Sequence, residues 1–199
     1  MITLKQLRAI MSHAPMSRIE LFYAPLNSAM EEYAITTPLR QAAFLSQLAH
    51  ESGEFKWMHE LASGAAYDNR KDLGNTKAEA IEIAKKHGTT PGRWWKGHGP
   101  IQVTGFNNHE KYSEILYGDR EILLHEPTRL CEPLDGCRAA AAFFALEPGM
   151  IEAADAGDVF LVSQIVNVRP SQRGPDGRVP NGWTERKSYY MRAMRALES

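Results

Sequence analysis

The sequence predicts a mainly α-helical protein of one domain. Apolar residues recur every three to four positions over several long stretches, which is the period of an amphipathic helix. The chain has 199 residues, enough to bury a core without a disulfide or a metal. Hydrophobic residues make up 43% and charged residues 24%, close to the average of soluble globular proteins, so the composition excludes a disordered or fibrous chain.

Six segments carry the helical spacing, and local signals mark the ends of several. Thr37 followed by Pro38 is a helix start, because threonine can cap and proline in the first turn needs no N–H. Gly53 can end this helix. Asp158 and Thr184 can cap the two helices that follow them. The predicted helices are 4–12, 17–33, 38–51, 138–147, 158–167 and 185–197.

Two tracts do not hold a helical period. The first includes "SGAAYDNRKDLGNT" and "HGTTPGRWWKGHGPIQVTG", whose glycines, prolines and asparagines predict loops or short hairpin strands. The second, 167–183, is longer than an ordinary connection, and such loops are usually functional or mobile. We expect a single domain, 1–199, with a helical body at about 1–58 and 102–199 and a small loop-rich lobe at about 59–101.

Charge and cysteine content narrow the class of partner. The net charge of −1 gives no overall basic footprint, so we expect no nucleic-acid binding. The tract 169–195 nevertheless holds seven basic and two acidic residues, which is either a solvated surface or an attraction to a polyanionic polymer. The two cysteines, Cys131 and Cys137, suggest neither a disulfide framework nor a zinc site and fit a reducing compartment.

The N-terminal segment "MITLKQLRAIM" lacks the uncharged core of a secretion signal. No apolar run reaches the length needed to span a bilayer. We therefore expect synthesis in the cytoplasm and no stable membrane association.

Glu51 stands out in "QLAHESGEF". On a helix from Pro38, it shares a face with Phe44 and Leu48, at offsets of seven and three residues. Apolar neighbours favour the neutral carboxyl, which could then donate a proton as a general acid. The alternative is a salt-bridged or capping glutamate at a frayed helix end.

Hydrolysis of a glycosidic bond usually needs a second carboxyl. Glu54 follows Gly53 too closely to be carried across a cleft. Glu60 is the better candidate, because five or six extended residues at ~3.3 Å each can cross the gap of about 6.5–9.5 Å typical of inverting enzymes; the alternative is an exposed surface charge. His50 and His59 are nine apart, whereas the zinc-peptidase helix motif has histidines four apart, so no metal is expected.

Four segments in this order resemble glycoside hydrolase family 19, the chitinase-like family, and more narrowly its bacteriophage endolysin branch. They are "AFLSQLAHESGEF", "ELASGAAYDNRKDLGNT", "WKGHGPIQVTGFNNHEKY" and "NGWTERKSYYMRAM". The resemblance covers roughly 37–195. It implies a lysozyme-like helical domain of two lobes around a central cleft, which cuts β-1,4-linked N-acetylated polysaccharide by inversion with no cofactor.

The resemblance also implies roles for single residues. Glu51 matches the general acid, Glu60 the base, and Thr104 the hydroxyl residue that helps to hold the attacking water. Four further residues match positions that contact the substrate or line the cleft: Gln102, Asn108, Asn167 and Arg186.

Aromatic residues in the glycine-flanked loops have two interpretations. Tyr67, Trp94 and Trp95 could offer flat apolar faces to sugar rings, or could pack beneath a loop. Two departures from the family pattern also lie in such loops: His98 stands in "GHG" where related endolysins commonly have arginine, and "NVRPSQRG" stands where many members have Asn-Gly-Gly.

These observations predict a monomeric endolysin that hydrolyses bacterial peptidoglycan for phage release. It would wait in the host cytoplasm and reach the periplasm and wall through a membrane hole made by a phage holin. Alternatives are a chitinase acting on N-acetylglucosamine polymers, a catalytically inactive glycan-binding or virion protein, and an amidase or peptidase lysin. The resemblance uses nearly the whole chain, which leaves no separate wall-binding domain.

Overall fold

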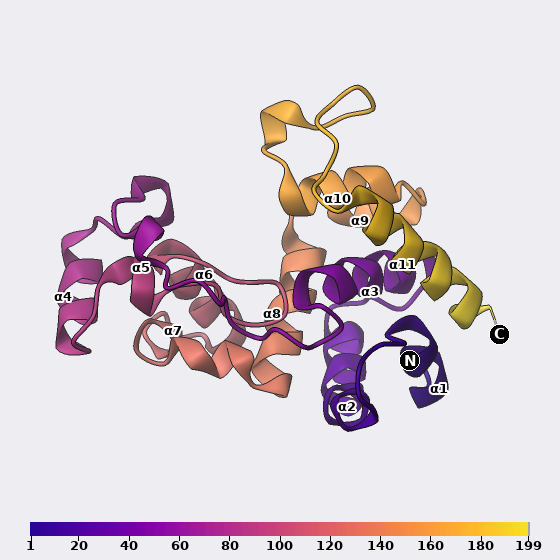
Figure 1. Cartoon of the computed structure of the whole chain (residues 1–199), viewed down its shortest axis with the longest axis horizontal. Coiled ribbons are helices and arrows are strands. Elements are labelled where there is room, and N and C mark those ends of the chain that lie inside the picture. Colours follow the sequence, from indigo (N-terminus) through magenta and orange to yellow (C-terminus); the bar gives the residue numbers. More distant parts are fainter. Residues whose placement is uncertain (199) are drawn as a thin grey trace. The chain divides into compact units, whose positions relative to one another are not determined.

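The computed structural model describes residues 1–198 and is mostly helical (Figure 1), which confirms the predicted fold class. The chain forms two compact units, Met1–Lys56 with Ala140–Ser199, and Trp57–Ala139. The lobe expected at about 59–101 thus makes up only the first part of the second unit, which continues to Ala139. Helix α8, Pro133–Leu146, begins in the second unit and ends in the first.

The first unit is built around helix α3, with helix α11 packed along it (Figure 1). Helix α3 is buried almost all round, from Gln41 to Ala49, because alanines and apolar residues face several neighbouring helices. The helices of this unit are α1 Leu4–Ile10, α2 Met16–Glu32, α3 Pro38–Ser52, α9 Met150–Asp155, α10 Val159–Asn167 and α11 Trp183–Leu197, with a 3-10 turn, η4, at Pro170–Gln172.

Three of the predicted helix ends are confirmed. The Thr37 hydroxyl accepts from Arg40 N at 3.3 Å, and Gly53 ends α3 in the left-handed region at φ 56°. Asp158 accepts from Leu161 N at 2.9 Å and caps α10. The Thr184 cap is wrong, since α11 begins at Trp183, after Gly182.

The second unit contains two helices that the apolar period did not predict, α4 Ala78–Lys86 and α6 Phe106–Tyr117. The buried side of α4 is partly alanine, and that of α6 includes two buried polar residues, His109 and Ser113, so neither shows a strong apolar stripe. The remaining elements are η1 Ala65–Tyr67, η2 Lys71–Leu73, α5 Pro91–Trp94, α7 Ile122–His125 and η3 Pro127–Cys131.

The glycine-rich tracts of this unit form turns and short helices rather than a hairpin. Two isolated bridges, His59 with His98 and His98 with Val103, are the extent of extended pairing in residues 1–198. They bring the segment before Glu60 against the "GHG" turn. A helix long and apolar enough to cross a membrane does not occur within the described part of the chain.

Candidate active site

Glu51 lies in the last turn of α3, in the first unit, with its side chain 23% exposed. Phe44 and Leu48, which share its face, are buried as predicted. Its carboxylate, however, contacts the guanidinium of Arg186, whose side chain is only 1% exposed. The prediction of apolar neighbours did not include this cation, and the salt-bridged alternative describes the contact that the carboxylate makes.

Arg186 joins several groups of the first unit. It enters from α11, donates to Gln47 Oε1 at 2.6 Å and to Asn181 O at 2.9 Å, and contacts Glu51 Oε1. Gln47 in turn donates to Ser163 Oγ on α10 at 3.1 Å. One cation thus ties α3, α11 and the loop before α11 together at the position of the candidate acid.

Asn167 belongs to the same network without touching Glu51. Its Oδ1 accepts from Asn181 N at 2.8 Å, and its side chain is exposed at the end of α10. Since Asn181 O accepts from Arg186, Asn167 orders the loop segment that presents the guanidinium.

Close packing at Gly182 fixes the start of α11. This glycine has φ 69°, and a Cβ there would collide with the ring of His50. His50 Nδ1 lies 2.6 Å from Glu185 Oε2, so the histidine next to Glu51 pairs with the first turn of α11. His50 thus has a hydrogen-bonding role of the kind usual for such residues.

Glu54 was set aside as a base from sequence, and the structure shows it as an internal acceptor, 3% exposed. Its Oε2 accepts from His13 N at 2.6 Å and Ala14 N at 2.9 Å, and its Oε1 accepts from Tyr189 OH at 2.9 Å. Burial acts to raise the pKa of Glu54, but the hydrogen bonds from His13 and Tyr189 outweigh it and hold the pKa below its usual value.

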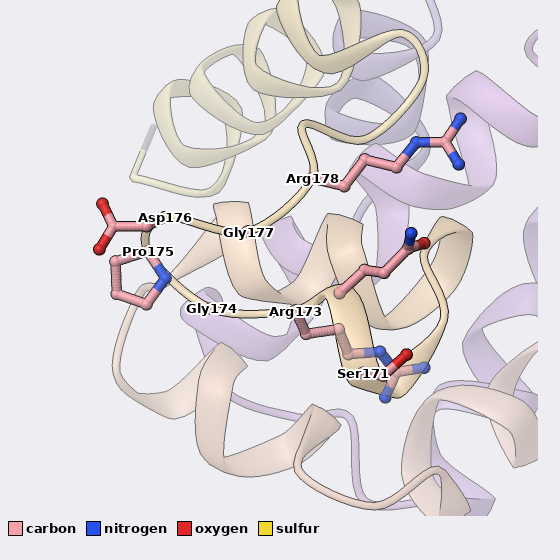
Figure 2. A pocket seen from close by; sticks show the side chains of 8 residues that line it. Ser171, Arg173, Gly174, Pro175, Asp176, Gly177 and Arg178 are labelled. Atoms are coloured by element: carbon pink, nitrogen blue, oxygen red, sulfur yellow. The ribbon is translucent and has the colours of Figure 1, made fainter.

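The irregular tract 167–183 keeps the loop character that the sequence predicted, apart from η4. Gln164 holds it, donating to Gly174 O and Arg178 O at 3.0 Å and accepting from Gly174 N at 2.8 Å. Residues 171–178 line a hollow of about 570 Å³, and Figure 2 shows the side chains that line it.

Glu60 lies in the second unit, half-buried, with both carboxylate oxygens occupied. Tyr67 OH donates to Oε1 at 2.9 Å, and Gly97 N donates to Oε2 at 3.1 Å. The Glu60 backbone is held too, since its N–H donates to Gly97 O at 2.8 Å and its carbonyl accepts from Lys96 Nζ at 2.9 Å. The alternative of a free surface charge does not describe this residue.

Three of the four polar residues of "PIQVTGFNN", namely Gln102, Thr104 and Asn108, are half-buried and linked in a chain. Gln102, at φ 55°, donates from Nε2 to Gly99 O at 2.8 Å. The Thr104 hydroxyl donates to Gln102 O at 2.9 Å, and Asn108 donates to Thr104 O at 2.7 Å. These bonds use donor hydrogens, so each side chain keeps oxygen lone pairs as acceptors.

The aromatic residues divide between core and site. Trp95 is fully buried in a cluster with Phe106 and Leu124, so the prediction that it offers a face to a sugar ring is wrong, and local packing is its role. Trp94 stacks on His87 with centroids 4.0 Å apart and donates to Leu124 O. Tyr67 is half-buried, and its hydroxyl donates a hydrogen bond to Glu60, a contact that sequence spacing did not indicate.

His98, in the "GHG" turn, is 3% exposed and lies against His109. His109 Nδ1 is 2.9 Å from Gly105 O and so carries its proton there, which leaves Nε2 to accept from His98 Nδ1 at 3.2 Å. Burial, with smaller effects of Lys96 and His59, lowers the pKa of His98 to about 4. Burial and then His98 lower that of His109 to about 3.

Within residues 1–198, no group of three or more histidine, cysteine or acidic side chains is arranged to hold a metal ion. The Glu51 carboxylate instead contacts a guanidinium, and the Glu60 carboxylate accepts from a phenol and a backbone amide. Such groups suit hydrogen bonding to a sugar and proton transfer.

Several solved structures have a fold similar to that of this chain. Chitinase C from Streptomyces griseus matches with a TM-score of 0.73 and 16% identity, over 100% of this chain and 77% of that one. The chain has the fold of the family 19 chitinases. A bacterial family 19 chitinase matches at 0.67 and 18% identity, over 98% and 94% of the two chains. A class IV chitinase from Zea mays matches at 0.63 and 18%, over 96% and 90%.

These three likenesses confirm the chitinase-like fold that the sequence motifs predicted. No protein-family model matches the chain.

Proposed function

We propose that this protein is a glycoside hydrolase that cleaves β-1,4 bonds of bacterial peptidoglycan by inversion and acts as a phage endolysin. The observation that carries the proposal is the whole-chain likeness to solved structures of chitinases, at TM-scores of 0.63 to 0.73. It is supported by Glu60, whose carboxylate is fixed by two donors in the manner of a preorganised group.

Glu51 is the proposed general acid. Arg186 contacts Oε1, so the proton for the leaving sugar oxygen would be carried on Oε2. The contact with Arg186 sets the direction of the carboxyl, and bound glycan would exclude water from the 23% of the side chain that is exposed. In the reaction, Glu51 gives its proton to the glycosidic oxygen as the bond to the anomeric carbon breaks.

Glu60 is the proposed base and Thr104 its helper. Because the Thr104 hydroxyl donates to Gln102 O, its oxygen acts as an acceptor. A water that donates one hydrogen to Thr104 and the other to Glu60 has a lone pair free to attack the anomeric carbon. Glu60 then takes the proton, and attack from the side opposite the leaving group inverts the configuration.

Charge favours peptidoglycan over chitin as the substrate. The tract 169–195 has a formal charge of +5, seven basic against two acidic residues. Its exposed basic residues are Arg169, Arg178, Lys187 and Arg195, and its two acidic residues, Asp176 and Glu185, are exposed as well. Peptidoglycan carries free carboxylates on its stem peptides, whereas chitin is neutral, so a basic surface assists binding of peptidoglycan. Chitin hydrolysis is the second candidate, since the similar structures are those of chitinases.

The biological setting follows from the proposed reaction and the motif resemblance. The enzyme would act as a monomer, be stored in the host cytoplasm and meet the glycan strands in the periplasm after a phage holin opens the membrane. Its reaction requires neither a cofactor nor a metal, so chelators should leave it unchanged.

The test measures new reducing ends and loss of turbidity with outer-membrane-permeabilised Gram-negative cells, alongside purified peptidoglycan and chitin. Glu51→Gln and Glu60→Gln should each reduce the rate at least about 100-fold. Glu20→Gln and Glu114→Gln, at exposed positions of the two units, are the matched controls and should keep it. Sedimentation with peptidoglycan without new reducing ends would instead identify an inactive glycan-binding protein.

A further inference from the structure

The phenol of Tyr67 contacts the carboxylate of the proposed base, Glu60. Its hydroxyl is 2.9 Å from Glu60 Oε1, on the oxygen that Gly97 N leaves unoccupied. A carboxylate on an exposed side chain can turn about its terminal torsion, which is a broad and roughly two-fold rotor. With one donor on each oxygen, the plane of the Glu60 carboxylate is fixed.

Tyr67 is itself held at the backbone, not by its hydroxyl alone. Its N–H donates to Gly64 O at 2.9 Å, and its carbonyl accepts from Asn75 Nδ2 at 2.8 Å. Asn75 is fully buried, and its Oδ1 accepts from Phe106 N at 3.0 Å at the start of α6. The phenol is therefore anchored through Asn75 to the helix that follows Thr104.

Glycines make this placement of the 3-10 turn η1 possible. Gly64, at φ 80°, begins the turn, and a Cβ there would collide with Gly92 O. Asp68, directly after Tyr67, accepts from Gly92 N at 2.8 Å. The loop that carries Tyr67 is thus fastened on both sides to the α5 region rather than free to follow a sugar.

We propose that Tyr67 is a positioning residue whose hydroxyl holds the Glu60 carboxylate in the orientation that accepts the proton of the attacking water. The inference rests on the proposed role of Glu60 as base, and it replaces the sugar-stacking role that the sequence suggested for Tyr67. The phenol suits this task because it remains a donor: burial, and then the hydrogen bond to Glu60, raise the pKa of Tyr67.

Sugar stacking and positioning of Glu60 predict different effects of replacing Tyr67 by phenylalanine. A ring that stacks on a sugar keeps its face in Tyr67→Phe and loses it in Tyr67→Ala, which would raise KM. A positioning hydroxyl is lost in both variants, so kcat should fall about tenfold or more in each, with KM of Tyr67→Phe within about twofold of wild type.

The experiment compares kcat and KM on soluble peptidoglycan fragments and chito-oligosaccharides for wild type, Tyr67→Phe, Tyr67→Ala and Glu60→Gln. Tyr23→Phe, a half-buried tyrosine on α2, is the control for removal of a phenolic oxygen. Circular dichroism and thermal melts check that each variant is folded. The acid limb of the rate profile of Tyr67→Phe should move to higher pH, because a carboxylate that has lost a donor binds its proton more tightly.

The outcomes separate this inference from the proposed function. An inactive Glu60→Gln with a fully active Tyr67→Phe would overturn the positioning role and leave the hydrolase intact. A fully active Glu60→Gln, or a wild-type chain that cuts neither glycan, would overturn the proposed function and the inference with it. A loss of kcat in Tyr67→Phe with an unchanged KM and a displaced acid limb supports the role.

Discussion

The guanidinium of Arg186, 1% exposed, contacts the carboxylate of Glu51 in the first unit. The same guanidinium donates to Gln47 Oε1 at 2.6 Å, and its Nε donates to a loop carbonyl. A buried cation of this kind is costly unless it is paired and hydrogen-bonded. Its partners therefore tie the position of Glu51 to the stability of the unit.

Replacement of Arg186 by methionine should destabilise the protein by about 2–4 kcal/mol. The variant fills a similar volume but leaves Glu51, Gln47 Oε1 and Asn181 O without their donor. Urea unfolding followed by circular dichroism measures the change. Arg195→Met, on the exposed side of α11, is the control and should lie within about 0.5 kcal/mol of wild type. Equal stability of the two variants would show that the Arg186 contacts do not contribute.

Gly182→Ala should be more destabilising than Gly157→Ala. Both glycines have φ 69°, so the backbone strain is matched, but a Cβ at Gly182 collides with the His50 ring, whereas one at Gly157 meets only ordinary contacts at 3.8 Å and beyond. We expect a difference of about 1–3 kcal/mol, measured by thermal unfolding. Equal losses would mean that the close approach of α11 to α3 is not as the structure describes.

Glu54 should make the stability of the first unit depend on pH in the acid range. Its pKa is lowered in the folded state, so its contribution is present above the unfolded pKa and is lost as pH falls through the folded value. Glu54→Gln should cost about 2 kcal/mol near pH 7, because the amide has one acceptor oxygen where the donors from His13, Ala14 and Tyr189 use two. The difference between variant and wild type should shrink as the pH is lowered, and a pH-independent difference would contradict this role.

The pair His98 and His109 should also weaken folding as pH falls, for the opposite chemical reason. Their pKa values are lowered to about 4 and about 3, so between pH 6.5 and these values the unfolded chain binds protons that the folded chain excludes. As the pH is lowered through this range, the free energy of unfolding decreases by up to about 1.4 kcal/mol per pH unit for each ring. NMR titration of the imidazole protons checks this, and a midpoint near 6.5 for His109 would contradict its burial as a neutral donor–acceptor pair.

Local chemistry made part of the fold predictable. Thr37, Pro38 and Gly53 delimit α3 through a cap, a fixed φ and a left-handed residue, and these effects act within a few residues. The start of α11 depends instead on the ring of His50, which is more than 130 residues away in the sequence, so no local signal could find it. The apolar period did not predict helix α6, because two positions on its buried face are the hydrogen-bonding residues His109 and Ser113 rather than apolar residues.

The candidate site, too, was predictable where local spacing decides and not where contacts between distant segments decide. Spacing placed Glu51 beside Phe44 and Leu48, but the cation that contacts it comes from a helix near the C-terminus. Glycine-flanked aromatic residues look alike in sequence, yet Trp95 is buried in a core cluster and Tyr67 donates to Glu60. Such differences arise from tertiary contacts that spacing does not encode.

The proposed function requires Glu51 and Glu60 to act as acid and base on opposite faces of a sugar. Proton NMR of the product within the first minutes of hydrolysis, before mutarotation, tests it most directly. Inversion at a β-1,4 bond predicts that the α-anomer of the new reducing end appears first. First appearance of the β-anomer would mean a covalent or substrate-assisted route and would contradict the assignment of Glu60 as the base.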